Sequence, residues 1–543
     1  MRTYLRTVVE KALDRLGISP DSAPAFEKPR GEEHGDLTTS IAFVLGKRLH
    51  RNPRELAQQI IELMDVDKKL VQNIECAGPG FINVKFTELF FQQQLGEIPR
   101  CGDAFGRSTR YSGRRVQVEF VSANPTGPLT VGHGRGAVYG DTVARLLEWT
   151  GHIVEREYYF NNAGRQMRIL GESVRLRYLE LLGDTIVFPE EYYQGEYIKE
   201  IAGHLVEEHG GSLREEPATG RFKEQAEGEI FEDIKKTLKS LDITFDSFYN
   251  EHSLYETGKI TNVIEDLRGR DLVYEQEGAV WFRASRLGNE KDKVIVKSSG
   301  EPTYRLPDIA YHREKFARGY DMMIDVFGAD HVATYPDVLA ALKALDYDTG
   351  KIKVLIHQFV TITQNGEVVK MSTRKANFIT LDELIADVGA AVVRYFFLMR
   401  TIASHLNFDI ELARKQSDDN PVYYLQYAHA RIASILRFAG QEGKISQAPP
   451  EYALLNTLAE QDLIKNLLEF PDMVESCALS YEPHRLADYL QVIAGMFHRF
   501  YHECRVVTED IRLTNSRLSL CRATQIVMKN GLTILGIPAP ESM

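Results

Sequence analysis

The chain has 543 residues, of which 43% are hydrophobic and 26% are charged, a profile typical of a globular protein with three or four domains. Its five cysteines are scattered and none belongs to a C-x-x-C pair, so the sequence suggests neither a zinc site nor a disulfide framework and fits a reducing compartment. The net charge of −12 argues mildly against a nucleic-acid partner, although binding depends on the charges within a screening length of about 8 Å.

Residues 1–95 are predicted to form a small α+β domain. Apolar residues from Leu5 to Leu16 recur at helical spacing, which indicates a core helix rather than an export signal. Asn52-Pro53-Arg54-Glu55 predicts the cap and first turn of a further helix, and a turn at 77–80 precedes a strand-like run. No run reaches the roughly 18 consecutive apolar residues of a membrane span, so no membrane partner is expected.

The pattern of residue types changes after residue 110, and residues 110–375 are predicted to form a doubly wound α/β domain. A strand is predicted at 116–120, followed by a glycine- and proline-rich loop at 122–134 and by a helix that ends at Gly151. Strand, glycine-rich loop and helix form the opening unit of a nucleotide-binding domain of this kind. A helical insertion is expected around residues 168–270.

Later parts of the chain combine strands, a hairpin and helices. A strand-like run returns near 354–356, and Asn365-Gly366 between two β-prone runs is a strong signal for a hairpin. Residues 376–410 are predicted to connect this domain to the last one. Residues 411–543 are predicted to be almost entirely helical, and Asn420-Pro421 should open the longest helix of that region.

Two separate segments carry residue types suited to phosphate chemistry. The loop 128–136, Pro-Leu-Thr-Val-Gly-His-Gly-Arg-Gly, precedes a helix, so its glycines allow close approach and the helix terminus offers free N–H groups to an anion. The segment 370–374, Lys-Met-Ser-Thr-Arg, follows the predicted hairpin, and its cations are suited to stabilise a leaving pyrophosphate. Taken singly, the first segment is equally consistent with a tight turn and the second with a solvated basic turn.

Together these segments resemble the two signature motifs of class I aminoacyl-tRNA synthetases, and the wider sequence resembles the arginyl-tRNA synthetases of the bacterial type. The resemblance covers nearly the whole chain in the family's order, through the stretches 34–39, 118–128, 158–164, 303–312, 327–331, 377–381 and 420–431. It implies an α/β, Rossmann-like class I synthetase catalytic domain, an N-terminal α+β domain that contacts tRNA, and an all-helical C-terminal anticodon-binding domain.

The same resemblance implies an arginine–tRNA ligase. Such an enzyme uses ATP with Mg²⁺ to form arginyl-adenylate and then transfers arginine to the 2′-OH of the 3′-terminal adenosine of tRNA(Arg), releasing AMP and pyrophosphate. The resemblance further implies a cytoplasmic monomer without a tightly bound protein metal. In the family, arginine activation itself requires bound tRNA, and we carry this over as an expectation.

The expected substrate contacts are carried over from the family's motifs, position by position. Those for arginine are Glu119, Ser122, Asn124, Tyr304 and Asp308. Those for ATP are Thr130, Gly132, His133, Gly136, Gly328, Asp330, His331, Lys370, Met371 and Ser372. The catalytic residues, expected to stabilise the reacting phosphates, are Thr130, His133, Lys370 and Arg374. Those for tRNA are Tyr423, Gln426, Tyr427, His429 and Arg431.

The chemistry of arginine agrees with acidic residues at this site. A guanidinium is a planar, permanently charged fork of donors, so its pocket needs carboxylates and neutral acceptors. We therefore expect Asp308 to pair with the guanidinium and Tyr304 to pack on it or hydrogen-bond to it, while Glu119 and Asn124 hold the α-amino end. Without the resemblance, Tyr304 and Asp308 would more simply be a buried tyrosine and a helix cap.

Two positions depart from the family's signatures. Thr130 stands where the first signature usually has histidine, and Thr373 stands where the second usually has lysine. A threonine hydroxyl can donate one hydrogen bond but cannot become cationic, and loss of one charge-stabilising donor can lower a rate by about 10²–10³. Lys370, Arg374 and Arg135 are the candidates to supply the missing charge.

Three other functions stay open on the sequence alone. A class I synthetase for another amino acid, such as cysteine, would usually carry a zinc site, which no cysteine cluster supports here. A catalytically retired paralogue would bind tRNA without charging it, and Thr130 is its only support. A small-molecule adenylating ligase would share the nucleotide-binding half, but the long helical C-terminal region argues against it.

Overall fold

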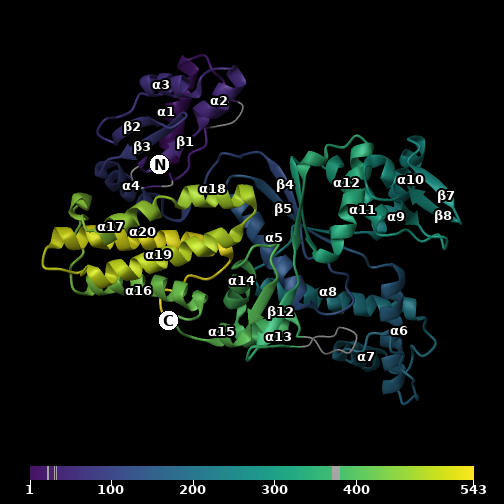
Figure 1. The fold of residues 1–543 in the computed structure, drawn as a ribbon. Coiled ribbons are helices and arrows are strands. Elements are labelled where there is room, and N and C mark those ends of the chain that lie inside the picture. Colours follow the sequence, from purple (N-terminus) through teal and green to yellow (C-terminus); the bar gives the residue numbers. More distant parts are fainter. Residues whose placement is uncertain (21–23, 30, 32–33, 370–378) are drawn as a thin grey trace.

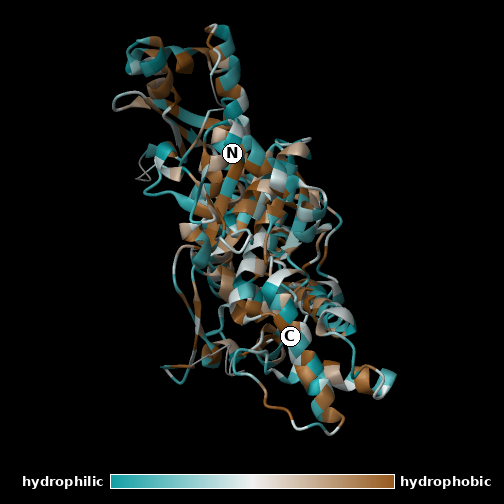
Figure 2. Ribbon diagram, turned by 90° about the vertical axis from the view of Figure 1, so that its right-hand side faces the viewer, coloured by the Kyte–Doolittle hydropathy of each residue, from teal (hydrophilic) through white to brown (hydrophobic). Residues whose placement is uncertain are grey.

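The computed structural model describes the whole chain except residues 21–23, 30, 32–33 and 370–378. Figure 1 shows an N-terminal body, a central body built on a parallel sheet with two lobes beside it, and a helical body that ends the chain. In Figure 2 apolar segments gather in the interior, and polar segments are frequent on the outer helices. Among the described residues, no helix combines the length and the apolar character that crossing a bilayer requires.

The N-terminal body packs helices against a three-stranded antiparallel sheet of order β1-β3-β2. Its helices are α1 (Arg2–Arg15), α2 (Ile41–Leu49), α3 (Pro53–Leu63) and α4 (Glu88–Cys101), and its strands are β1 (Leu37–Thr39), β2 (Val71–Ala77) and β3 (Phe81–Phe86). The predicted cap of α3 is confirmed, because the side chain of Asn52 accepts a 2.9 Å hydrogen bond from the Arg54 amide. The apolar stripe of α1 is buried, as its spacing predicts.

The central body is built on five parallel strands in the order β11-β10-β4-β5-β6. They are β4 (Arg115–Glu119), β5 (Ile153–Phe160), β6 (Ser247–Asn250), β10 (Met322–Gly328) and β11 (Ile352–His357). Of these five strands β4 comes first in the sequence, yet it lies in the middle of the sheet. The later strands are added on one side of β4 as β5 and β6 and on the other side as β10 and β11, so the order switches direction at β4. Ligands of doubly wound folds bind outside the carboxyl ends of the strands at such a point. The predicted fold is confirmed, and the sheet edge after Glu119 and Gly328 is the expected place for a site.

Two lobes flank this sheet. The first holds α6 (Gly164–Leu181), α7 (Glu196–His209) and α8 (Lys223–Ser240). The second has its own hydrophobic core and holds α9 (His252–Glu256), α10 (Lys259–Gly269), α11 (Arg305–Ala317) and α12 (Tyr335–Ala344) with the antiparallel strands β7 (Val273–Gln276), β8 (Ala279–Phe282) and β9 (Lys293–Val296). The expected helical insertion around 168–270 is therefore not purely helical, because it includes β6 of the main sheet. β6 has only four residues, too few for alternation to mark it.

The hairpin predicted at Asn365-Gly366 is confirmed. It joins β12 (Val360–Gln364) to β13 (Glu367–Val368), and its two central residues have positive φ angles of 52° and 78°. β14 (Leu406–Asp409) pairs in parallel with β12. The helices α13 (Leu381–Val388), α14 (Ala390–Leu398) and α15 (Ile410–Arg414) lead from this region to the helical body.

The helical body contains α16 (Pro421–Gln441), α17 (Leu458–Leu467), α18 (Phe470–Ser480), α19 (Pro483–Glu503) and α20 (Ile511–Leu535). The apolar stripe of α16 is buried, as predicted. The prediction that α16 is the longest helix is wrong, since it has 21 residues and α20 has 25. α20 packs against α16, α17 and α19, so it is buried on several sides and lacks a single apolar stripe that would mark its length.

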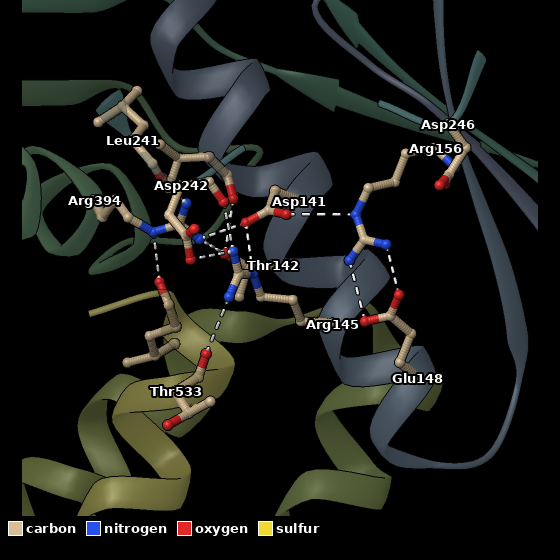
Figure 3. Close-up of polar contacts among 12 residues, drawn as sticks. Asp141, Thr142, Arg145, Glu148, Arg156, Leu241, Asp242, Asp246, Arg394 and Thr533 are labelled. Carbon is tan, nitrogen blue, oxygen red and sulfur yellow. Dashed lines mark hydrogen bonds and ion pairs between the residues drawn. The ribbon is translucent and has the colours of Figure 1, made fainter. Parts of the chain in front are cut away.

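A buried ionic network joins the central and helical bodies (Figure 3). Arg394 of α14 is 1% exposed and pairs at 2.6 Å with Asp141 of α5 (Val131–Trp149). The same guanidinium donates hydrogen bonds of 2.7 Å to the carbonyl oxygens of Leu241 and of Leu535, the last residue of α20. Asp141 also pairs with Arg145 at 2.8 Å. These contacts fix the body of α5 against the helical body, while the first turn of α5 lies at the sheet edge.

Candidate active site

The two segments predicted to hold phosphate approach each other at the first turn of α5. The amide of Leu381 donates a 2.8 Å hydrogen bond to the carbonyl oxygen of Leu129, and Thr130 forms a β-bridge with Thr380. The predicted contacts in the second segment, namely Lys370, Met371, Ser372 and Arg374, lie outside the described residues. The chain that follows them nevertheless returns to the start of α5, the helix whose first turn contains His133.

His133 is held by the residue that caps its own helix. Its Nδ1 accepts a 3.2 Å hydrogen bond from the main-chain amide of Thr130, and the Thr130 hydroxyl lies 3.2 Å from the same nitrogen. Burial lowers the pKa of the His133 imidazole, so the ring is neutral with its proton on Nε2. A neutral imidazole held in this way can donate one hydrogen bond to a phosphate oxygen. Thr130 therefore caps α5 and supports His133.

Glycines in the first turns of α5 let neighbouring segments approach closely. A Cβ atom at Gly134 would lie 2.6 Å from the Leu381 side chain, and one at Gly136 would lie 3.0 Å from Nε2 of His357. Gly136 is buried and faces His357, so close packing alone accounts for the glycine, and its predicted contact with ATP stays a prediction. Among the described residues, the nearest atom to a Cβ at Gly132 would be the Thr130 hydroxyl oxygen, at 3.6 Å.

The carboxyl ends of β10 and β11 bring Gly328, Asp330 and His331 together with His357, which the sequence did not single out. Gly328 pairs with His357 in the strand register, and a Cβ atom at Gly328 would lie 2.6 Å from a carboxylate oxygen of Asp330. His331 stacks on Phe327 with 4.7 Å between ring centroids. Burial lowers the pKa of His357 to about 4, so its ring is neutral at physiological pH. This wall offers acceptors and ring faces, which suit a ribose and a base.

Arg135 does not supply the positive charge that a histidine at position 130 could provide. Its side chain is fully buried, and its guanidinium donates to three main-chain carbonyl oxygens at 2.8 to 3.0 Å. Those donors are used by main-chain carbonyls and brace α5 against the segments around Gln358 and Ser404. The sequence could not reveal this, because a residue that follows a glycine-rich turn can face either side of the helix.

An acidic pocket lies beside this phosphate region. Asp308, in the first turn of α11, is partly exposed and lines a small cavity that also reaches His331. Burial, together with the neighbouring carboxylates of Glu119 and Glu251, raises the pKa of Asp308 to about 7. Tyr304, at the start of α11, is 74% exposed. The simpler alternative of a buried tyrosine is therefore wrong, and Asp308 is open to a ligand.

Glu251 is a carboxylate that the sequence did not single out. It follows β6 directly, and it accepts hydrogen bonds from the hydroxyl of Tyr159 at 2.8 Å and from the amide side chain of Asn161 at 2.7 Å. It is 6% exposed, and burial raises its pKa. Within the described part of the chain all its hydrogen-bond donors are neutral. A buried carboxylate with only neutral partners is suited to receive a cation from a ligand.

The loop between β4 and α5 is strained where it carries Ser122. Val121 and Ser122 have positive φ angles of 68° and 46°, which a β-branched residue rarely adopts. The Ser122 hydroxyl donates to Glu119 at 3.0 Å and accepts a main-chain amide of β5 at 3.3 Å, and Asn124 accepts another amide at 3.0 Å. Such backbone strain costs roughly 1–3 kcal/mol per residue and clusters at functional sites. Glu119, Ser122 and Asn124 are thus held together at the carboxyl end of β4.

Helix α16 presents four of the residues predicted to contact tRNA on its partly exposed side. They are Tyr423, Gln426, Tyr427 and Arg431. The rings of Tyr423 and Tyr427 stack with 6.4 Å between centroids, and the guanidinium of Arg431 lies 4.4 Å from the centre of the Tyr501 ring. Tyr427, Arg431 and Tyr501 border a surface hollow of about 1040 Å³ that also presents Arg437, Lys444 and Arg505. Ring faces beside cations suit unstacked bases and their phosphates.

His429, the fifth predicted tRNA contact, is not part of this surface. It is 2% exposed, and its Nδ1 donates a 2.7 Å hydrogen bond to the carbonyl oxygen of Pro540. Residues two positions apart in an α-helix differ by about 200° of rotation around its axis, so His429 points to the opposite side of α16 from Tyr427. The prediction that His429 contacts tRNA is therefore corrected: it anchors the segment around Pro540.

Comparison with known proteins matches three family models along the chain. Residues 3–86 match the arginyl tRNA synthetase N terminal domain, residues 104–394 match the catalytic domain of the class I (R) tRNA synthetases, and residues 425–543 match the DALR anticodon binding domain. The matched order is the one that the sequence motifs imply.

Individual relatives agree with these models. An arginine–tRNA ligase of Desulfotalea psychrophila is 54% identical over 520 residues, which are 95% of this chain and 94% of the relative, and one of Chlorobaculum parvum is 51% identical over the full length of both chains. The arginyl-tRNA synthetase structure from Thermus thermophilus is 23% identical, has a TM-score of 0.77 and matches both chains over their full length, which shows the shared fold. On these grounds the chain belongs to the arginine–tRNA ligases, a family of class I aminoacyl-tRNA synthetases.

Proposed function

We propose that the chain charges tRNA(Arg) with arginine in two steps at the sheet edge formed by β4, β10 and β11. In the first step the arginine carboxylate attacks the α-phosphorus of ATP, which forms arginyl-adenylate and releases pyrophosphate. In the second step the 2′-OH of the terminal adenosine of tRNA attacks the activated carbonyl carbon, and AMP leaves. The observation that carries this proposal is the acidic pocket around Asp308 and Glu251, next to the turn that contains Thr130 and His133.

The acidic pocket would select arginine by charge. Asp308 and Glu251 are two carboxylates that receive no cation from the described part of the protein, and a guanidinium supplies a positive charge with several donors to share between them. The exposed ring of Tyr304 is available to pack on the planar guanidinium. Glu119 and Asn124, fixed by the strained loop, would face the α-amino group. An amino acid with a neutral side chain would leave both carboxylates unpaired, which is strongly unfavourable.

The phosphates of ATP would lie at the first turn of α5. The phosphate oxygens would accept hydrogen bonds from free N–H groups of the helix terminus, around Thr130 and Gly132, and from Nε2–H of His133. ATP enters as its Mg²⁺ complex, in which phosphate oxygens and water supply ligands to the metal, so no cage of protein carboxylates is needed. Gly328, Asp330 and His331 would line the ribose and the base.

The second signature segment is proposed to contact the pyrophosphate as it leaves, through Lys370, Met371, Ser372 and Arg374. The cations of Lys370 and Arg374 would replace the positive charge that a histidine at position 130 could supply, since Arg135 is committed to main-chain carbonyls. The nucleophile of the first step is a carboxylate that is already ionised at neutral pH, so no general base is assigned. Catalysis then depends on positioning and on fixed charge.

We propose that the helical residues 411–543 bind the anticodon stem and loop, and that residues 1–95 make a further contact with tRNA. Tyr423, Gln426, Tyr427 and Arg431 would hold unstacked bases, with Arg437, Lys444 and Arg505 beside the phosphates. Residues 110–375 would carry the chemistry, and residues 376–410 would connect it to the anticodon domain. We further propose that the protein is a cytoplasmic monomer, which light scattering after size-exclusion chromatography would report as a mass near 61.7 kDa.

ATP–pyrophosphate exchange with each amino acid, with and without tRNA, tests this function. We expect exchange with arginine when tRNA is present, and none with any other amino acid. Exchange with a different amino acid would refute the assignment of the acidic pocket. Binding of tRNA without exchange would identify a protein that has lost catalysis, for which the replacement of a histidine by Thr130 is the only support.

A further inference from the structure

Lys315 of α11 is a fully buried cation that bridges two strands of the main sheet. Its Nζ lies 2.6 Å from Oε2 of Glu119 on β4 and 2.6 Å from Oδ1 of Asp325 on β10, and it lies 4.5 Å from the centre of the Tyr311 ring. An ammonium has three N–H donors, and here two carboxylates and one ring face occupy all three directions. Lys315 therefore has no donor left for a ligand, and it can act only through its partners.

The first partner, Glu119, is fixed from both sides. One carboxylate oxygen pairs with Lys315, and the other accepts the hydroxyl hydrogen bond of Ser122 at 3.0 Å. Each carboxylate oxygen has two lone pairs, so Glu119 can still accept a hydrogen bond from an amino group. Its orientation towards the strained loop after β4 thus depends on Lys315.

The second partner, Asp325, leads to the guanidinium side of the pocket. Its other oxygen lies 2.9 Å from Nε2 of His312, and Nδ1 of His312 lies 2.7 Å from the main-chain carbonyl oxygen of Asp308. Lys315, His312 and Asp308 all belong to α11, so the two contacts fix the first turn of this helix relative to the sheet. The cluster therefore connects the residues expected at the two ends of bound arginine.

The charges in this cluster are balanced except where the ligand would bind. Although burial disfavours charged groups, Asp325 raises the pKa of both Lys315 and His312. Lys315 pairs with both carboxylates, and both ring nitrogens of His312 face acceptor oxygens, so this geometry favours positive charge on the two side chains beside Glu119 and Asp325. In the described part of the chain no cation forms an ion pair with the Asp308 carboxylate, which lines the small cavity.

We propose that Lys315 is a positioning residue for arginine, which orients Glu119 towards the α-amino end of the substrate and neutralises the carboxylates that the guanidinium does not reach. This inference rests on the proposed function, because it gives Lys315 a part in binding the same substrate. Stability alone does not account for the arrangement, since buried ion pairs can often be replaced by apolar residues without loss of stability.

Steady-state aminoacylation by the full-length protein, with arginine and ATP varied separately, tests this proposal. Lys315→Met should raise the KM for arginine by about tenfold or more, because a charge-assisted contact is lost, and should change the KM for ATP by less than about twofold. Lys315→Met alone leaves two buried carboxylates without their cation, so Lys315→Met/Asp325→Asn is measured beside it. The double variant removes one charge of each sign, and we expect the same increase in the KM for arginine.

The matched control is Arg318→Met, at the residue that caps the end of α11. Arg318 pairs with Glu157 at 2.7 Å, and within the described residues it forms no ion pair with Glu119, Asp325 or Asp308, so its loss should lower thermal stability and leave the KM for arginine unchanged. Glu119→Gln should also raise the KM for arginine, but it should add little in the Lys315→Met/Asp325→Asn background. Folded Lys315 variants with a wild-type KM for arginine, or additive effects in this cycle, would overturn the proposal. Failure of the wild type to charge any tRNA with arginine would instead overturn the proposed function itself.

Discussion

The main-chain amide of Leu381 donates a 2.8 Å hydrogen bond to the carbonyl oxygen of Leu129. Leu129 ends the glycine-rich loop before α5, and Leu381 begins the first helix after the K-M-S-x-R segment. This contact and the bridge between Thr130 and Thr380 bring the flank of the second signature segment to the first. A side chain at Gly134 would collide with Leu381, so the glycine spacing of the first motif also serves this contact.

Thr130→Ala should impair both the fold and the chemistry. It removes the cap of α5 and one of the two groups that hold His133, so unfolding free energy should fall by about 1 kcal/mol and the rate of pyrophosphate exchange by about tenfold. Thr130→Ser keeps the hydroxyl and should retain both properties. Denaturant unfolding and exchange assays measure the two effects, and equal activity of the alanine and serine variants would contradict this function for Thr130.

Glu251→Gln should weaken arginine binding without weakening ATP binding. The amide keeps the volume and the hydrogen bonds to Tyr159 and Asn161 in part, but it removes a buried carboxylate that lies close enough to Asp308 to raise the pKa of Asp308. Charge-assisted contacts contribute about 1.5–3 kcal/mol, so the KM for arginine should rise by roughly 10- to 100-fold. An unchanged KM for arginine, in a variant that melts like the wild type, would remove Glu251 from the site.

The affinity for arginine should increase as pH rises through about 7. Burial raises the pKa of Asp308 to about 7; the nearby carboxylates of Glu119 and Glu251 act in the same direction, and His312 and Lys315 oppose it. Only the ionised carboxylate attracts a guanidinium, so kcat/KM for arginine should be about tenfold lower at pH 6 than at pH 8. Because the pKa of Asp308 is higher in the folded protein than in the unfolded chain, this residue favours the ligand-free fold most below about pH 4, where it is protonated in both states. That contribution to the free energy of unfolding is lost as pH rises to about 7.

Asp308→Asn provides the comparison for this pH dependence. The asparagine variant should have a lower kcat/KM for arginine at every pH, and its profile should lack the step near pH 7. A profile with the same step as that of the wild type would assign the titration to another group.

Arg394→Met should destabilise the protein far more than removal of a surface ion pair. Loss of Arg394 leaves Asp141 with fewer cations and two buried carbonyl oxygens without donors, so unfolding free energy should fall by about 3–5 kcal/mol. Arg214→Met removes the exposed pair with Asp184 and should cost less than about 1 kcal/mol. Similar midpoints of thermal unfolding for the two variants would show that the network in Figure 3 does not hold the bodies together.

Local signals in the sequence predicted several elements of the fold correctly. Asn52-Pro53 and Asn365-Gly366 specify a cap and a turn through their own side chains and backbone preferences, so no distant contact is needed to recognise them. The motif around His133 was recognisable for the same reason, because it combines a strand end, glycines and a helix start within one short segment.

Residues whose function depends on distant partners could not be found in this way. Glu251 follows a strand too short to recognise, and Lys315 lies in a charged run that would normally face solvent, yet it is fully buried against Glu119 and Asp325. His429 was wrongly placed on the tRNA surface because the burial of one side of α16 depends on the segment around Pro540. Spacing along the chain carries no information about such partners.

The central claim is that the carboxylates of Asp308 and Glu251, beside the first turn of α5, select arginine by its charge. The most direct measurement is kcat/KM for the charging of tRNA(Arg) with arginine against citrulline, which has nearly the same shape but no charge. We predict that the wild type favours arginine by about 10³-fold or more and that Asp308→Asn reduces this preference at least about tenfold. Comparable charging with both amino acids, or a preference that Asp308→Asn leaves intact, would contradict the account.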